Sequence, residues 1–162
     1  MPHGLAAMLY TGLKTLHLIG VVLLVGNAIV TLIWKLAADR TRDPRVLAFA
    51  QRLVVLTDWW FTVGGVGLLA LGGYGAALVA GLDVLNVGWL VWGQALLALS
   101  GALWAGVLVP AQIRQGRQAR AFAESGEIPA SYWRAGRRWA VWGVAATVLL
   151  VVAIGIMVAK PV

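Results

Sequence analysis

Four long apolar runs dominate this sequence and restrict the folds open to it. A helix needs roughly 20 apolar residues to cross about 30 Å of hydrocarbon, and the runs cover about residues 9–34, 53–79, 87–113 and 139–158. With 61% hydrophobic and 12% charged residues, the chain has too little polar surface for a soluble fold of this size. We therefore expect an all-α protein, a bundle of four transmembrane helices that forms one domain over residues 1–162.

The connections between the runs indicate where the helices begin and end. Asp43 followed by Pro44 is typical of an N-cap and a first-turn proline, so the second helix is expected to begin near Pro44, before it enters lipid. The segment 114–123 can continue the third helix out of the membrane until Ser125-Gly126 ends it. Pro129 and Ser131 then restart a helix. Helices two and three are thus predicted to extend beyond the bilayer.

The basic residues predict the direction of the helices. The connection between residues 81 and 86 carries no Lys or Arg. The two other connections carry five and six of the 13 basic residues: Lys35, Arg40, Arg42, Arg45 and Arg52, then Arg114, Arg117, Arg120, Arg134, Arg137 and Arg138. Loops rich in Lys and Arg stay in the cytoplasm. We expect a bacterial inner-membrane protein with both termini periplasmic and with helices two and three extended into the cytoplasm.

The charge distribution and the absence of cysteine argue against nucleic-acid binding and against cysteine-dependent sites. The net charge of +7 sits in short connections between apolar runs, so we interpret it as topological charge and expect no nucleic-acid partner. The chain has no cysteine, which excludes disulfides, thiolate metal sites, iron–sulfur clusters and covalent attachment of haem.

Ionisable and amide side chains inside the apolar runs are the candidate site residues, because lipid penalises them. Lys14 and His17 lie three residues apart on the first helix and share a face, with Asn27 deeper and near the same face. Gln94 on the third helix lies at a similar depth to His17. Three interpretations of His17 remain open: a structural histidine bonded to Gln94 or to a backbone carbonyl, a haem ligand, or a proton carrier.

The second run is dense in glycine, with six between Gly64 and Gly75. Small residues let helix backbones approach closely, or they present a shallow face to a planar cofactor. Both interpretations apply to Gly72, and the sequence does not choose between them.

A second polar group is expected nearer the cytoplasm, around Asp58. Thr57 is its neighbour in sequence, and Thr31 and Gln112 lie at a similar depth on other helices. Asp58 has no cation beside it in the apolar run. It is expected either to form an ion pair at the membrane interface, with Arg52 or Arg114 as partner, or to relay protons.

Three segments of the chain resemble a family of bacterial predicted integral membrane proteins of unknown function. The resemblance rests on Lys14-x-x-His17, Thr57-Asp58 with Phe61-Thr62, Gly72-Gly73, Trp104 and Pro110-x-Gln112. The first helix is also similar to that of the haem-containing membrane protoporphyrinogen oxidases and of copper-resistance membrane domains. That similarity implies that His17 ligates haem b iron, with Lys14 as a neighbour.

Three functions follow as hypotheses. The first is a haem b-binding redox enzyme or electron carrier, with His17 as axial ligand, Lys14, Gln94 and Gly72 around the cofactor, and a membrane electron-transfer partner. The second is a transport component for protons or small ions that uses His17 and Asp58, with Thr57, Asn27 and Gln112 as further polar groups. The third is a structural or assembly subunit. Each hypothesis places the chain in the lipid bilayer, and a homo-oligomer is compatible with all three.

Overall fold

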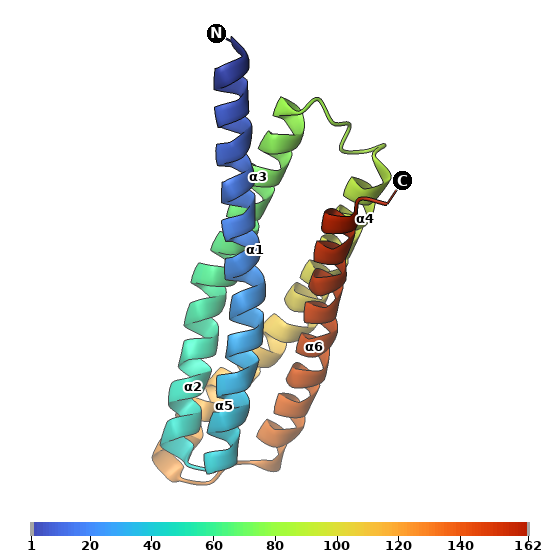
Figure 1. Ribbon diagram of the computed structural model, residues 1–162. Helices are drawn as coiled ribbons and strands as arrows, with labels where there is room; N and C mark the ends of the chain where they lie inside the picture. The colour runs from blue at the N-terminus through green and yellow to red at the C-terminus, as the bar shows by residue number, and fades with distance from the viewer. Residues whose placement is uncertain (1, 162) are drawn as a thin grey trace.

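The computed structural model describes residues 2–161, which fold into four long helical rods joined by short connections (Figure 1). No strand occurs in that part of the chain. Two of the rods each contain a short π-helical segment, η1 or η2. In chain order the elements are α1 (Pro2–Thr41), α2 (Pro44–Thr57), η1 (Asp58–Val63), α3 (Gly64–Val79), α4 (Gly88–Leu103), η2 (Trp104–Leu108), α5 (Val109–Ser125) and α6 (Ala130–Ala159).

The helix boundaries follow from local chemistry. The Asp43 side chain accepts hydrogen bonds from the backbone N–H groups of Arg45 (2.7 Å) and Val46 (3.3 Å), which caps the helix that begins at Pro44. Gly126 ends α5 in the left-handed conformation (φ 79°), where an L side chain is disfavoured. The predicted start near Pro44 and the predicted end at Ser125-Gly126 are both confirmed.

All four rods are long and apolar enough to cross a membrane, and each exceeds the span predicted for it. Within the most apolar stretch of each rod, no more than 22% of the residues are buried inside the bundle. Many of the remaining side chains are exposed on the outside of the bundle, and numerous aliphatic and aromatic ones are among them, so lipid is the solvent that this surface suits. The prediction of a bundle of four transmembrane helices is confirmed.

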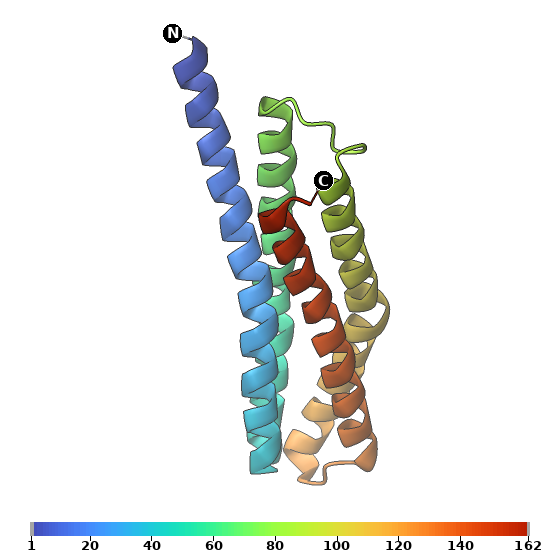
Figure 2. The same ribbon diagram turned by 45° about the vertical axis from the view of Figure 1, so that its right-hand side comes forward.

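The chain termini lie at one end of the bundle, which we call the terminal end, and the two basic connections lie at the other, the basic end (Figure 1). At the basic end α1, α2, α5 and α6 pack around one another. Toward the terminal end the rods separate into two pairs, α1 with α3 and α4 with α6 (Figure 1), and α1 extends beyond the ends of the other rods (Figure 2). No Cα atom of α3 comes within 8 Å of one in α4. The bundle is therefore closed at the basic end only.

Glycines of α3 let α1 approach closely. A Cβ atom added to Gly65 would lie 3.0 Å from the backbone nitrogen of Leu24 and 3.1 Å from the carbonyl oxygen of Gly20. One added to Gly72 would collide with the backbone of Leu13 and His17. Backbones this close gain van der Waals contact that larger side chains would prevent. At these positions the structure thus shows helix packing, the first of the two interpretations of the glycine-rich run.

This packing yields a prediction about stability. Gly72→Ala places a methyl group against the backbone of α1, which cannot move aside as a flexible side chain can, and overpacking of this kind costs about 1–3 kcal/mol. Gly67→Ala is the matched control, because no atom lies within 4 Å of its added Cβ. We expect Gly72→Ala alone to lower the thermal unfolding temperature in detergent. Equal melting of the two variants would contradict the packing described here.

Candidate functional site

Asp58, the first residue of η1, is 9% exposed and lies where three of the four rods meet. Its Oδ1 atom accepts hydrogen bonds from Asn27 Nδ2 (2.9 Å) on α1 and from Thr62 Oγ1 (3.1 Å) one turn further along its own rod. Its Oδ2 atom accepts from Gln112 Nε2 (2.6 Å) on α5 and Trp104 Nε1 (3.3 Å) at the start of η2. The carboxyl group therefore joins three rods.

Two further bonds complete this group, which we call the Asp58 network: Asp58, Asn27, Thr31, Thr62, Trp104 and Gln112. Asn27 Nδ2 also donates to Thr62 Oγ1 (3.0 Å), and Thr31 Oγ1 donates to Asn27 Oδ1 (3.1 Å). An ionised carboxylate offers about four acceptor positions and has no proton to donate. The four donors around Asp58 match that number, so the geometry suits the ionised form.

The partners of Asp58 are all neutral. The sequence allowed an ion pair with Arg52 or Arg114, but both residues are exposed, and the one ion pair among residues 2–161 joins Lys35 to Asp39. That expectation was wrong because both arginine side chains extend away from the bundle interior. The negative charge of an ionised Asp58 thus has hydrogen bonds and no cation beside it.

The two π-helical segments meet at this network. Asp58 begins η1 and Trp104 begins η2, and the two side chains are hydrogen-bonded to each other. In η2 the N–H of Val109 bonds to the carbonyl of Trp104, five residues earlier. Pro110 explains this wider turn, because it has no N–H to give to Gly106 and its ring would clash in a regular helix. Single π turns of this kind are frequent at functional sites.

A cavity of about 340 Å³ adjoins the Asp58 network between the rods. Its polar wall comes from Asp58, Thr31, Thr62, Ser100, Gln112 and Thr147, and Trp104 and Trp139 also line it. Much of the remaining wall is apolar, with Leu24, Leu32, Val63, Val66, Leu97 and Leu108 among its residues.

The cavity has access to the outer surface of the bundle. Its wall includes Val63, Val66, Gly101 and Ala105, which are exposed on that surface. The first two residues belong to η1 and α3, and the others belong to α4 and η2. Because the backbones of α3 and α4 are not in contact, we place the opening between these two rods, facing lipid.

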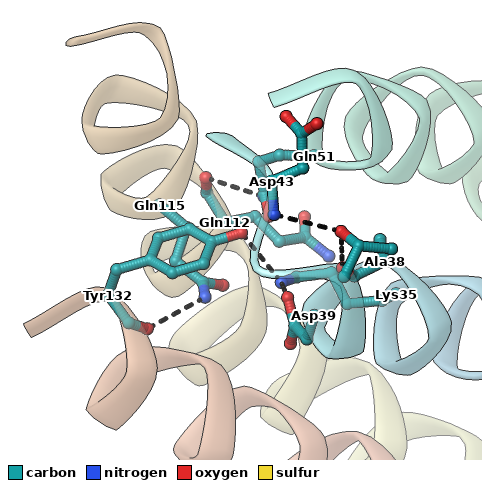
Figure 3. Close-up of polar contacts among 9 residues, drawn as sticks. Lys35, Ala38, Asp39, Asp43, Gln51, Gln112, Gln115 and Tyr132 are labelled. Carbon is teal, nitrogen blue, oxygen red and sulfur yellow. Dashed lines mark hydrogen bonds and ion pairs between the residues drawn. The ribbon is translucent and has the colours of Figure 1, made fainter. Parts of the chain in front are cut away.

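Between the cavity and the basic end lies a second polar layer, which we call the Lys35 layer: Lys35, Asp39, Gln51 and Tyr132 (Figure 3). Lys35, only 2% exposed, donates from Nζ to Asp39 Oδ1 (2.8 Å) and to Tyr132 Oη (3.0 Å). Gln51 Nε2 donates to the carbonyl of Gln112 (3.3 Å), the residue whose side chain reaches Asp58. This layer joins α1, α2, α5 and α6 and closes the bundle on the basic-end side of the cavity.

The predicted outer group does not assemble as a cluster. His17 Nδ1 lies 2.8 Å from the carbonyl oxygen of Leu69 on α3, and because a carbonyl oxygen only accepts, this nitrogen is the donor. Gln94 bonds instead to the hydroxyl of Tyr74 (2.8 Å) and to the carbonyl of Val84 (2.7 Å). Of the two partners expected for a structural His17, the backbone carbonyl is the one observed, and the bond to Gln94 does not form.

Two other candidates lie apart from the Asp58 network. Lys14 is exposed, with Nζ 5.9 Å from the centre of the Tyr10 ring. Thr57 Oγ1 donates to the carbonyls of Leu53 and Val54 in its own helix. Of the residues predicted to form the polar groups, the structure brings together Asp58, Asn27, Thr31 and Gln112. Thr62 and Trp104, which the sequence analysis named only for the family resemblance, join them. A signal for Trp104 existed, because a buried indole N–H usually has a partner.

A comparison with known proteins identifies the family. The model of the family described as "Predicted integral membrane protein (DUF2269)" matches residues 11–161. The chain belongs to this family and is an integral membrane protein that crosses the membrane several times. No curated protein and no solved structure matches the chain. The similarity of the first helix to haem-containing oxidases therefore receives no support from these comparisons.

The network yields a prediction that separates two neighbouring threonines. Thr62→Val removes a donor to Asp58 and the acceptor of an Asn27 bond. Since side-chain hydrogen bonds in membrane proteins average about 0.6 kcal/mol and reach about 1.7, we expect a loss of about 1 kcal/mol. Thr57→Val breaks bonds only within its own helix and is expected to cost less than about 0.5 kcal/mol. Reversible unfolding in mixed detergent micelles measures both, and a Thr57 effect equal to the Thr62 effect contradicts the assignment.

Proposed function

We propose that this member of the DUF2269 family is a transport component that moves protons through the Asp58 carboxyl group. The observation that carries this proposal is a buried carboxyl group with four neutral donors, no cation partner and a cavity beside it. Of the three functions considered from the sequence, it is the one that the geometry supports best.

The cost of placing Asp58 in the bundle supports a functional role. An acidic side chain at the centre of a transmembrane helix costs about 2.5–3.5 kcal/mol on insertion scales. The neutral amide, hydroxyl and indole donors of the network offset part of this cost. A leucine would avoid this cost, and an asparagine would link the rods without burying a charge, so linking the rods does not by itself require a carboxyl group here.

The network also indicates how a proton is accommodated. A protonated carboxyl group donates one hydrogen bond, so one of the four present donors must turn away or exchange roles when Asp58 takes a proton. The hydroxyl of Thr62 is suited to this exchange, because a hydroxyl both donates and accepts. Asn27, Trp104 and Gln112 offer N–H groups to Asp58 and are fixed as donors unless their side chains turn.

The route to Asp58 is asymmetric. The cavity extends from Asp58 toward the terminal end along Val66 and Leu97, which is the side from which we propose that the proton arrives, and the Lys35 layer closes the basic end. If the basic end is cytoplasmic, as the distribution of Lys and Arg predicts, then proton release to the cytoplasm requires the bonds of Lys35 to Asp39 and Tyr132 to open. His17 does not line the cavity, so we leave it out of this route.

Haem b bound to His17 is the second candidate, and one observation favours it. Ligating histidines usually donate their other ring N–H to a carbonyl or carboxylate, as His17 does toward Leu69. The glycines predicted to admit the porphyrin do not add support, because Gly72 contacts the backbone of α1 and Gly73 contacts the His17 ring. The support for haem is therefore limited to the His17 ring, whose Nε2 atom would be the ligand to the iron.

A flux assay tests the proposed function. In vesicles that contain the purified protein and a trapped pH-sensitive dye, a membrane potential is expected to drive proton entry. Asp58→Asn is expected to abolish the protein-dependent part of this flux, because an amide side chain does not bind and release a proton near neutral pH.

The control for this assay is Asp83→Asn, the same substitution in the exposed turn between α3 and α4. Hydrogen bonds from the Asn86 side chain and the Leu85 backbone hold the pKa of Asp83 below its usual value, so Asp83 is ionised at neutral pH. We expect full flux from this variant. Equal flux from wild type and Asp58→Asn would overturn the proposed function.

Absorption spectra of the purified protein test the second candidate. If haem binds at His17, the oxidised and dithionite-reduced protein has a Soret band that His17→Ala lacks. Protein produced with ample haem and lacking a Soret band in both forms would exclude haem at this residue.

A further inference from the structure

We propose that the cavity beside Asp58 binds a lipophilic organic cation whose charge is quaternary or delocalised. This inference deepens the proposed function and rests on the role given there to Asp58 as a carboxyl group that binds and releases a proton. It names the substrate class that shares this carboxylate with the proton.

The size and the wall of the cavity favour an organic ligand over an inorganic ion. Its volume of about 340 Å³ falls within the range of small-molecule sites, about 300–1,000 Å³. A single dehydrated metal ion fills only a small part of such a space. Much of the wall is aliphatic, and apolar cavities tend to stay dry unless an apolar molecule fills them.

The charge at one end of the cavity selects a cation. Asp58 is the one titratable side chain that lines the cavity within residues 2–161, and no Lys or Arg lies against its carboxyl group. The elements packed around that group present Asn27 and Thr31 from α1, Thr62 from η1, Trp104 from η2 and Gln112 from α5, none of which is charged. A cation in the cavity supplies the missing countercharge.

The hydrogen bonds of Asp58 narrow the class further. Four donors already occupy its acceptor positions, so a primary ammonium group would have to displace one of them to donate its own hydrogen. A quaternary ammonium or a delocalised cation has no such requirement, since it is attracted by charge alone. The intact network therefore suits a cation without strong donors.

Two indole rings in the wall add a second attraction for the same class. Trp104 and Trp139 both line the cavity, and quaternary ammonium ligands are typically held by aromatic faces. Trp139 is 6% exposed, and its Nε1 atom has no hydrogen-bond partner. This unpaired donor matches a ligand that also carries an acceptor group.

The opening of the cavity also suits a lipophilic molecule. It lies between the α3 rod and the α4 rod, at Val63, Val66, Gly101 and Ala105, where the bundle faces lipid. An amphiphilic cation dissolved in the bilayer reaches the cavity from the side without crossing water. An inorganic ion has no comparable route through hydrocarbon.

Binding of a simple member of this class tests the inference. The probe is labelled benzyltrimethylammonium, measured by equilibrium dialysis against wild-type protein in lipid nanodiscs at neutral pH. We expect saturable binding of the labelled cation. Neopentylbenzene, the neutral molecule of the same shape, is expected to compete about thirtyfold more weakly than unlabelled benzyltrimethylammonium. Acidification is expected to release the cation, because a proton then occupies the same carboxylate.

Four variants assign the site. Asp58→Asn is expected to bind the cation about thirtyfold or more weakly, because the countercharge is lost, whereas Asp83→Asn binds as wild type. Trp139→Leu is expected to weaken binding by about threefold to tenfold through loss of the aromatic face. Trp139→Phe, which keeps an aromatic ring, is expected to retain most of the wild-type affinity.

The possible outcomes separate this inference from the proposed function. Absence of saturable binding overturns the inference, and so does equal competition by the neutral molecule or equal binding to Asp58→Asn, either of which indicates a merely apolar cavity. The comparison of the two competitors uses wild-type protein, so it holds even if a variant fails to fold. The proton flux assay contains no organic cation and the dialysis contains no pH gradient, so either proposal can fail alone.

Discussion

A single carboxyl group holds the centre of this bundle together. Asp58 receives hydrogen bonds from α1, from its own rod and from the third rod. Gln112 connects it to the Lys35 layer, because its side chain donates to Asp58 and its backbone carbonyl accepts from Gln51. In lipid no water is available to replace these bonds, so a donor that loses Asp58 has few other partners. The two π-helical segments belong to the same arrangement, because they begin at Asp58 and Trp104. Packing supports the arrangement from outside, through the glycine contact between α1 and α3.

The same arrangement explains why the bundle is closed at one end and open at the other. At the basic end, polar bonds and two small apolar clusters around Val54 and Leu47 connect neighbouring rods. Toward the terminal end, α3 and α4 are linked by the side-chain bond from Tyr74 to Gln94, while their backbones remain apart. The proposed transport role requires the two pairs of rods to change their separation at the terminal end. Access to Asp58 from one side at a time is the property that a carrier of protons or cations requires.

Much of the fold could be predicted from the sequence, because apolar run length and helix-ending residues act locally. Asp43, Pro44 and Gly126 fix helix ends by themselves, without reference to the rest of the chain. The polar group around Asp58 was partly predictable, because equal depth in the membrane brought Thr31 and Gln112 to the same level.

Depth alone does not say which rods are neighbours, and this is why His17 was matched with Gln94 although α1 packs on α3. Thr57 was chosen for its proximity in sequence, yet residues four apart share a helix face and adjacent residues do not, so Thr62 is the partner. The wider turn at η2 changes which side chains face inward and made Trp104 harder to predict.

The central claim is that the Asp58 carboxyl group exchanges its proton within the bundle. Infrared spectroscopy of the protein in lipid measures this directly, through the difference between wild type and Asp58→Asn as pH is varied. The account predicts a protonated-carboxyl band that grows on acidification in wild type, is missing from the variant, and shrinks when benzyltrimethylammonium is added at constant pH. A carboxyl signal from Asp58 that stays unchanged across the titration and on addition of the cation would contradict it.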